Sequence, residues 1–187
     1  MKYSNIIKWI ILFIIIYAIY ITIFKGYHEI LPSFPIYPRN KKEFVDVKKM
    51  MEKRTRDDEA FFHLTNDSIA AAFVPYVKEN KKELEKIATS HNFIIITFKT
   101  IINRRRPWQI DPTLKPINIK TAQTPAYPAG HAYQAHLLCK YLVKKYPNKK
   151  DILEKVALRC DDCRIKAGLH YPSDGKFSRQ LVDLFYK

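Results

Sequence analysis

The second half of the chain contains two histidines whose neighbours could support chemistry on a phosphate. His131 directly follows Gly130, and His170 stands four residues before Asp174. An imidazole can give a proton to a leaving oxygen, and it can attack phosphorus when a carboxylate fixes its tautomer and raises its basicity. A glycine at the start of a helix lets the backbone approach an anion, toward which the free N–H groups point. The pattern predicts an anion site with an acid and a nucleophile.

Three cations are spaced to bind the oxygens of such an anion. Lys99 and Arg106 are seven residues apart, which is two helical turns, so we expect both on one face of one helix. Arg164 stands six residues before His170. Guanidinium and ammonium groups bind a multiply charged oxyanion through charge-assisted hydrogen bonds. The cations therefore predict a phosphate-binding cluster beside the two histidines.

Each segment alone also has a simpler interpretation. Arg104 and Arg105 stand beside Arg106, and such a run is also typical of a solvated basic face. Asp174 follows Pro172 closely, so an alternative is that it merely caps a helix and that His170 has no catalytic role. The prediction of one site therefore rests on the three segments taken together.

Taken together, the three segments resemble the signature of a known superfamily. The chain reads K-x6-R-P over residues 99–107, P-A-G-H over 128–131, and C-R-x5-H-x3-D over 163–174. In this order and spacing they resemble the motifs of type 2 phosphatidic acid phosphatases, bacterial non-specific acid phosphatases and vanadium-dependent haloperoxidases. The resemblance covers residues 99–174 and implies an all-α helical bundle.

The resemblance also implies how the phosphate is bound. In such enzymes the residues that match Lys99, Arg106 and Arg164 hold the phosphate oxygens and stabilise charge in the transition state. The match to Gly130 donates its backbone N–H to the phosphate. The cationic side chains take the place of a metal ion, so no metal and no other cofactor is expected.

The remaining matched residues are those that the resemblance implies to be catalytic. His170 would attack phosphorus in line and form a phosphohistidine, with Asp174 orienting its ring. His131 would protonate the leaving oxygen and then assist the water that releases phosphate.

Two positions depart from the family pattern. Ala129 stands where the motif has serine, which removes one hydroxyl donor to the phosphate, and Cys163 replaces the serine before Arg164. Loss of a hydrogen bond to a charged acceptor is worth about 1–3 kcal/mol. We expect slower turnover and not its loss, because the nucleophile, the acid and the cations remain.

The expected function is a metal-independent phosphatase acting on a phosphomonoester or diphosphate, with a lipid phosphate at a bilayer surface as one option. One alternative is a haloperoxidase that uses vanadate as its cofactor, since vanadate mimics the transition-state geometry in the same kind of pocket. A second alternative, motivated by Ala129, is a catalytically weakened protein that binds phosphate or an anionic membrane surface.

The composition agrees with anionic partners but does not choose among them. Of the 187 residues, 33 are Lys or Arg and 18 are Asp or Glu, a formal net charge of +15. Such a field attracts phosphorylated molecules, anionic membranes or nucleic acid, and no feature predicts specific nucleic-acid binding. Cys160 and Cys163 lack a second pair of ligands, so helix packing is a better interpretation than a metal site.

The N-terminal region predicts a membrane anchor. Residues 9–24 carry no charge, and Lys8 and Lys25 flank them. A run of this kind approaches the ~20 residues that cross a bilayer, so we expect one uncleaved transmembrane helix within residues 1–25. A cleaved signal peptide fits less well, because no small-x-small site follows the run.

The rest of the chain is expected to form one domain outside the bilayer. Three closely spaced prolines indicate an extended linker over residues 26–40, and the helical domain would occupy 41–187. Positive charge is heavier after the apolar run than before it, which favours a single-pass protein with its domain in the cytosol.

The hydrophobic pattern of this domain predicts helices and no strands. We expect helices over residues 44–51, 57–73, 84–102, 131–146 and 151–169, and a last one after Pro172. Polar or proline-containing loops are expected over residues 80–86 and 108–124.

Overall fold

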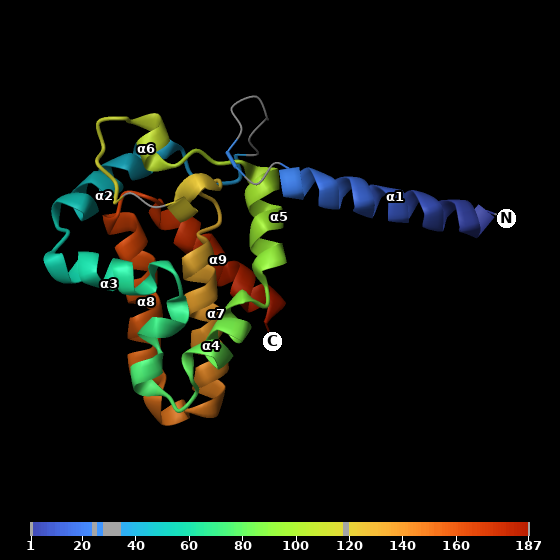
Figure 1. The fold of residues 1–187 in the computed structure, drawn as a ribbon. Helices are drawn as coiled ribbons and strands as arrows, with labels where there is room; N and C mark the ends of the chain where they lie inside the picture. The colour runs from blue at the N-terminus through green and yellow to red at the C-terminus, as the bar shows by residue number, and fades with distance from the viewer. Residues whose placement is uncertain (1, 24–25, 28–34, 118–119, 187) are drawn as a thin grey trace.

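The computed structural model describes residues 2–23, 26–27, 35–117 and 120–186. Within these ranges the chain forms helices and no strand, which confirms the predicted all-α class (Figure 1). The α-helices are α1 (Lys2–Ile23), α2 (Asn40–Glu52), α3 (Arg56–Asn66), α4 (Lys81–Thr89), α5 (Asn92–Ile102), α6 (Pro107–Ile110), α7 (Gly130–Lys145), α8 (Lys150–Lys166) and α9 (Pro172–Phe185). Short 3-10 helices are η1 (Ile69–Ala72), η2 (Val74–Tyr76), η3 (Lys120–Gln123) and η4 (Pro147–Lys149).

The centre of the bundle is the pair α7 and α8, joined by η4. These two helices make the most extensive contact of the described chain, and α9, α4, α3 and η1 pack around them. The largest buried cluster includes Phe73, Leu84, Leu138 and Leu142, none of which is exposed. Burial of this apolar surface holds α7 and α8 together and so fixes the position of the N-terminus of α7.

The predicted single helix over residues 84–102 is wrong, as is the predicted loop over 80–86. Asn80 caps α4 instead: its side chain accepts from the N–H of Glu83, whose carboxylate accepts from the N–H of Asn80. The helix then breaks between α4 and α5, where Thr89 and Ser90 hydrogen-bond to carbonyl groups one turn back. Such side chains compete with the helical backbone, so two helices form.

The C-terminal end of α5 changes the expected placement of two cations. Asn103 adopts the left-handed conformation with a φ of 49°, and its N–H caps the carbonyl of Lys99. Arg106 therefore lies beyond α5 in extended backbone, and Pro107 opens α6 at a position where a missing N–H costs nothing. The prediction that Lys99 and Arg106 share one helix face is wrong.

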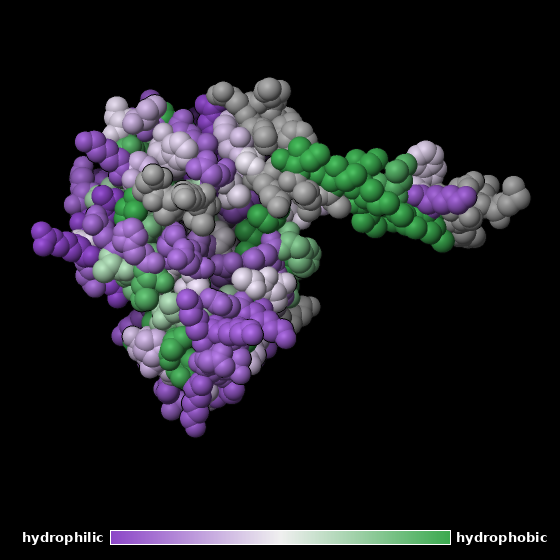
Figure 2. Space-filling model, viewed as in Figure 1, coloured by the Kyte–Doolittle hydropathy of each residue, from purple (hydrophilic) through white to green (hydrophobic). Residues whose placement is uncertain are grey.

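Helix α1 lies apart from the bundle and contacts it at α5 (Figure 1). Its described apolar side chains are largely exposed, with Trp9 and Phe13 at 70% and 69% (Figure 2). Among the described residues, no helix combines the length and the apolarity of a membrane span, so the predicted transmembrane anchor is not supported. Lys25 and part of the predicted linker, residues 28–34, lie outside the described residues.

Candidate active site

The predicted site residues come together where α5 ends and where α7 and α9 begin. His170 lies in the short segment between α8 and α9, in which Gly168 has a φ of +75° and turns the chain. A cleft of about 500 Å³ opens here. The predicted residues that line it are Lys99, Arg106, Gly130, His131 and His170. The other two, Asp174 and Arg164, are buried behind this lining.

His170 is held by Asp174 from one side and faces a cation on the other. Its Nδ1 lies 3.0 Å from Oδ2 of Asp174, and its Nε2 lies 3.2 Å from Nη1 of Arg106. Because the guanidinium can only donate, Nε2 must accept, so the proton of the neutral ring sits on Nδ1. Burial lowers the pKa of His170 well below its usual value, and the charge of Arg106 lowers it further. The ring is therefore a neutral imidazole with the lone pair of Nε2 turned toward the cleft cations.

Lys99 and Arg106 are oriented by backbone carbonyl groups of the segment before α7. Nζ of Lys99 donates to the carbonyl of Pro125, and Nε of Arg106 donates to that of Thr124 at 2.7 Å. Burial lowers the pKa of Lys99 well below its usual value, and that of Arg106 to about 10. Bringing two cations together at low exposure is unfavourable unless an anion binds between them.

Arg164 has fewer partners than the other cations. Its side chain is 1% exposed, and its Nη2 donates to Oγ1 of Thr65 at 2.8 Å. Nε and Nη1 have no hydrogen-bond partner within the described part of the chain. Its charge lowers the pKa of both His131 and His170, which places it near both rings. Unpartnered buried N–H groups are costly, and the oxygens of a bound anion would satisfy them.

His131, the second residue of α7, is also neutral. Its Nε2 lies 3.0 Å from the carbonyl oxygen of Asn66 at the end of α3, so this nitrogen carries the proton. Burial lowers its pKa well below the usual value, and the charge of Arg164 contributes next. The proton that the expected acid would deliver is thus bonded to Asn66 in this state of the protein.

The first turn of α7 is tightly packed at Ala129. This residue is fully buried, its N–H donates to the carbonyl of Asp174 at 3.2 Å, and its carbonyl accepts from Oγ of Ser178. A Cβ on Gly130 would meet Cγ2 of Ile95 at 3.5 Å, an ordinary contact. Space alone therefore does not require glycine at position 130.

The sequence interpretation missed Arg104, which is not part of a solvated face but fully buried. Its Nη1 lies 2.5 Å from Oδ1 of Asp174, and its Nη2 lies 2.7 Å from Oε2 of Glu43. In an extended segment, residues two apart point to the same side, so Arg104 follows the direction of Arg106 into the protein. That period-two signal was hidden by the expectation of a helix through residue 106.

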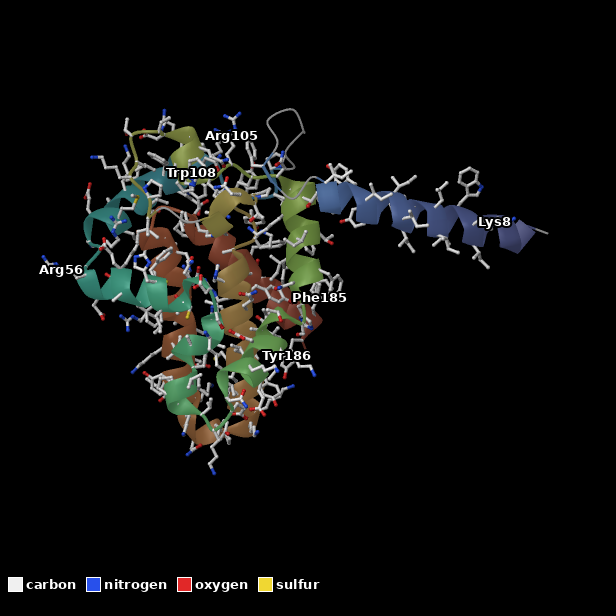
Figure 3. All side chains as sticks on the ribbon, viewed as in Figure 1. Lys8, Arg56, Arg105, Trp108, Phe185 and Tyr186 are labelled. Atoms are coloured by element: carbon white, nitrogen blue, oxygen red, sulfur yellow. The ribbon has the colours of Figure 1, made fainter. Side chains whose placement is uncertain are left out.

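A second cleft, of about 550 Å³, is lined in part by Arg105 and Trp108, whose side chains are labelled in Figure 3. None of the predicted site residues lines it. The smaller cleft is the better candidate for an active site, because two oriented histidines and two buried cations converge there.

The fold resembles that of a solved phosphatase. No protein-family model matches the sequence, and no curated protein matches it. Among solved structures, a transmembrane PAP2-type phosphatidylglycerolphosphate phosphatase from Bacillus subtilis is similar, with a TM-score of 0.52 and 19% sequence identity. The similarity covers 78% of this chain and 85% of that chain. It shows that the two proteins share a fold.

Proposed function

We propose that this protein is a phosphatase of the type 2 phosphatidic acid phosphatase kind. The observation that carries the proposal is a neutral His170 whose Nδ1–H is held by Asp174 and whose Nε2 faces Arg106 across 3.2 Å. The shared fold with a PAP2-type phosphatase supports the same conclusion independently of these side chains. Hydrolysis of a phosphomonoester or diphosphate is the reaction that this arrangement fits best.

In the first chemical step, Nε2 of His170 donates its lone pair to phosphorus while the bond from phosphorus to the leaving oxygen breaks. Asp174 accepts a hydrogen bond from Nδ1–H and stabilises the positive charge that develops on the ring. Lys99, Arg106 and Arg164 bind the phosphate oxygens, where charge accumulates in the transition state, so no metal ion is needed. The products are a phosphohistidine and an alcohol or a phosphate.

His131 would protonate the leaving oxygen and then take a proton from the water that attacks phosphohistidine. Burial lowers its pKa most and the charge of Arg164 next, so a bound phosphate, which offsets the cations, would raise that pKa and favour a protonated ring. The ring must also leave the carbonyl of Asn66, 3.0 Å away. We expect this exchange when substrate enters the cleft.

The test is phosphate release from lipid and soluble phosphates with a chelator present. His170→Ala should lower kcat by about 1,000-fold or more, and His131→Ala by about 100-fold. His63→Ala, which alters an exposed histidine on α3, is the matched control and should keep wild-type activity. Labelled phosphate transferred from substrate to the wild-type protein should stay attached in alkali and be released in acid, as expected for a phosphohistidine. Full activity in His170→Ala would contradict the proposed nucleophile.

A second candidate is a protein that binds phosphate with little turnover, which Ala129 favours because the motif serine is absent. Stoichiometric phosphate binding without hydrolysis of any substrate would support this candidate. If Ala129→Ser then raised turnover by about tenfold, the missing hydroxyl would explain the weak activity. Bromide oxidation that depends on added vanadate would instead support a haloperoxidase.

We also propose that the substrate is a lipid phosphate reached at a membrane. The exposed apolar side chains of α1 would bury into a bilayer, and the net charge of +15 suits an anionic surface. In the full chain, Ile11→Glu with Ile15→Glu should abolish sedimentation with anionic vesicles, while soluble phosphate hydrolysis stays unchanged. Unaltered sedimentation would contradict the role of α1, and a preference for soluble phosphates would contradict the lipid substrate.

A further inference from the structure

Arg104 lies at the centre of a buried polar network that connects α2 to the start of α9. Its Nη1 donates to Oδ1 of Asp174 at 2.5 Å and to Oγ of Ser173 at 2.7 Å. Its Nη2 donates to Oε2 of Glu43 at 2.7 Å, and its Nε to Oδ1 of Asn40 at 3.0 Å. Each of its three nitrogens thus has a partner, and the side chain has no exposed surface.

Two tyrosine rings hold the plane of this guanidinium. The carbon Cζ of Arg104 lies 3.9 Å from the ring centroid of Tyr171 and 4.3 Å from that of Tyr37. Cations stack favourably on aromatic faces, most of all where water is excluded. The rings cover the faces of the guanidinium, and its N–H groups, which lie in its plane, donate to the two carboxylates, Ser173 and Asn40.

Glu43 fixes the other side of the network. Its Oε1 accepts from the N–H of Ser173 at 2.8 Å, and its Oε2 accepts from the hydroxyl of Ser173 at 2.7 Å. A carboxylate at the N-terminus of a helix satisfies free N–H groups and is favoured by the helix dipole. Glu43 therefore anchors the first turn of α9, the turn that carries Asp174.

Asp174 is acceptor to three donors at once. Oδ1 accepts from Arg104, and Oδ2 accepts from the N–H of Tyr171 at 2.9 Å and from Nδ1 of His170 at 3.0 Å. Only an ionised carboxylate accepts at both oxygens in this way. The network supplies the donor on the oxygen that His170 does not use.

We propose that Arg104, with Glu43 behind it, is a positioning residue that keeps Asp174 ionised and oriented toward Nδ1 of His170. This inference rests on the proposed phosphatase function and adds two residues that no motif specifies: Arg104, at a variable position of the first motif, and Glu43, outside all three. Arg104 acts through Asp174 and does not line the cleft. The basicity of His170 would then depend on α2, which lies far earlier in the chain.

The positive charge of Arg104 affects the pKa of Asp174, so its role can be measured as a change in pH dependence. Burial raises the pKa of Asp174, and the positive charge of Arg104 opposes that rise more than any other group. The charged and titratable groups that face Asp174 or its partner guanidinium come from all the surrounding elements. Among the described residues these groups include Tyr37, Glu43 of α2, Lys99 of α5, Arg104, Arg106, Tyr127, Asp161 of α8, His170 and Tyr171.

Two substitutions should move the pH profile of kcat/KM in opposite directions. Arg104→Gln removes a cation within contact of Asp174, so the acidic limb should shift to higher pH by about 1–3 units. Glu43→Gln removes a negative charge from the same guanidinium, so the limb should shift to lower pH by a smaller amount. A network that only stabilises the fold would lower activity in both variants and shift neither limb.

Arg104→Lys keeps the charge and should restore the position of the limb, at a lower kcat because the forked geometry is lost. KM should change little in all three variants, since the phosphate-binding cations are untouched. Arg159→Gln, which removes an arginine paired with exposed Asp57, is the matched control. An unshifted limb in Arg104→Gln would overturn the proposal. If that variant does not fold, an unshifted or upward limb in Glu43→Gln overturns it.

A readout without turnover separates this inference from the proposed function. The ¹⁵N chemical shifts of His170 report which ring nitrogen carries the proton. Wild type should show an Nδ1–H strongly hydrogen-bonded to Asp174, and Arg104→Gln should move the Nδ1 proton resonance upfield because that bond weakens, while Arg106 keeps the proton on Nδ1. If wild type hydrolysed nothing, the proposed function would fail while this result still decided the role of Arg104. An unchanged Nδ1 proton resonance in Arg104→Gln would overturn it.

Discussion

Arg104 and Arg164 are both almost fully buried near His170, yet they differ in their hydrogen-bond partners. Every nitrogen of Arg104 donates to an oxygen, and two of its partners are carboxylates. Within the described chain, Arg164 donates to one acceptor, the hydroxyl of Thr65, and two of its buried nitrogens have none. Burial is the same, but only one of the two cations is neutralised by the protein.

This difference distinguishes a cation that stabilises the fold from one whose free N–H groups are available to a bound anion. A buried charge is tolerated when it is paired and hydrogen-bonded, so Arg104 contributes to the folded state itself. An unpaired buried charge reduces stability unless a ligand completes its environment. We therefore expect the two arginines to respond in opposite ways when each is replaced by methionine.

The largest effect on stability is expected for Arg104→Met. The substitution leaves Asp174 and Glu43 buried without their cation, which should lower the free energy of unfolding by about 3–5 kcal/mol. Urea denaturation of wild type and variant measures this loss. A change below about 1 kcal/mol would show that Arg104 is not needed to neutralise the two carboxylates.

For Arg164→Met we expect a large loss of activity with little loss of stability. Without this cation, kcat should fall by about 100- to 1,000-fold, as for the removal of one donor to a transition-state oxyanion. The free energy of unfolding should stay within about 1 kcal/mol of wild type, because an unpaired charge is removed. Inorganic phosphate should raise the Tm of wild type more than that of the variant. An equal rise in both proteins would contradict a role of Arg164 in binding.

A smaller effect, on the pH dependence of stability, is expected from the two histidines of the cleft. Burial lowers the pKa of both His131 and His170 in the folded protein, whereas the unfolded chain takes up their protons near pH 6.5. Their contribution to stability is therefore present above about pH 6.5 and is lost as the pH falls, by at most about 1.4 kcal/mol per pH unit for each histidine.

Denaturation curves between pH 7.5 and 5.5 check this slope, and His131→Gln with His170→Gln should reduce it. Partly buried His136, whose pKa burial lowers to about 4, and buried Asp161, whose pKa burial raises to about 7, contribute in opposite directions to what remains. The matched control, His63→Gln, alters an exposed histidine and should leave the slope unchanged. A wild-type slope in the double variant would mean that other groups cause the acid sensitivity.

Much of the cleft could be predicted from residue type and spacing. The helices over residues 130–145 and 150–166 and the segment that carries His170 and Asp174 lie where the pattern placed them. These predictions succeed because the interaction between His170 and Asp174 is local, spanning one turn at the start of α9. The catalytic roles of these residues stay predictions until activity is measured.

Other features could not be predicted, because they depend on the balance between local backbone preferences and distant partners. The break between α4 and α5 follows from side chains at residues 89–90 that compete with the helix, against a hydrophobic pattern that continues through it. The left-handed Asn103 then turns the next residues into extended backbone. One such residue changes which side chains face inward, and periodicity does not reveal it.

The sequence by itself determined the inventory of the site: two histidines, one carboxylate, three matched cations and the all-α class. Their chemistry depends on residue type, and their order along the chain is enough to state it. Only the tertiary structure decided that Arg104 is buried with Glu43 and Asp174, whereas two nitrogens of Arg164 find no partner in the described chain. The reason is physical: the packing of α2 against α8 and α9 brings a carboxylate to one arginine and none to the other.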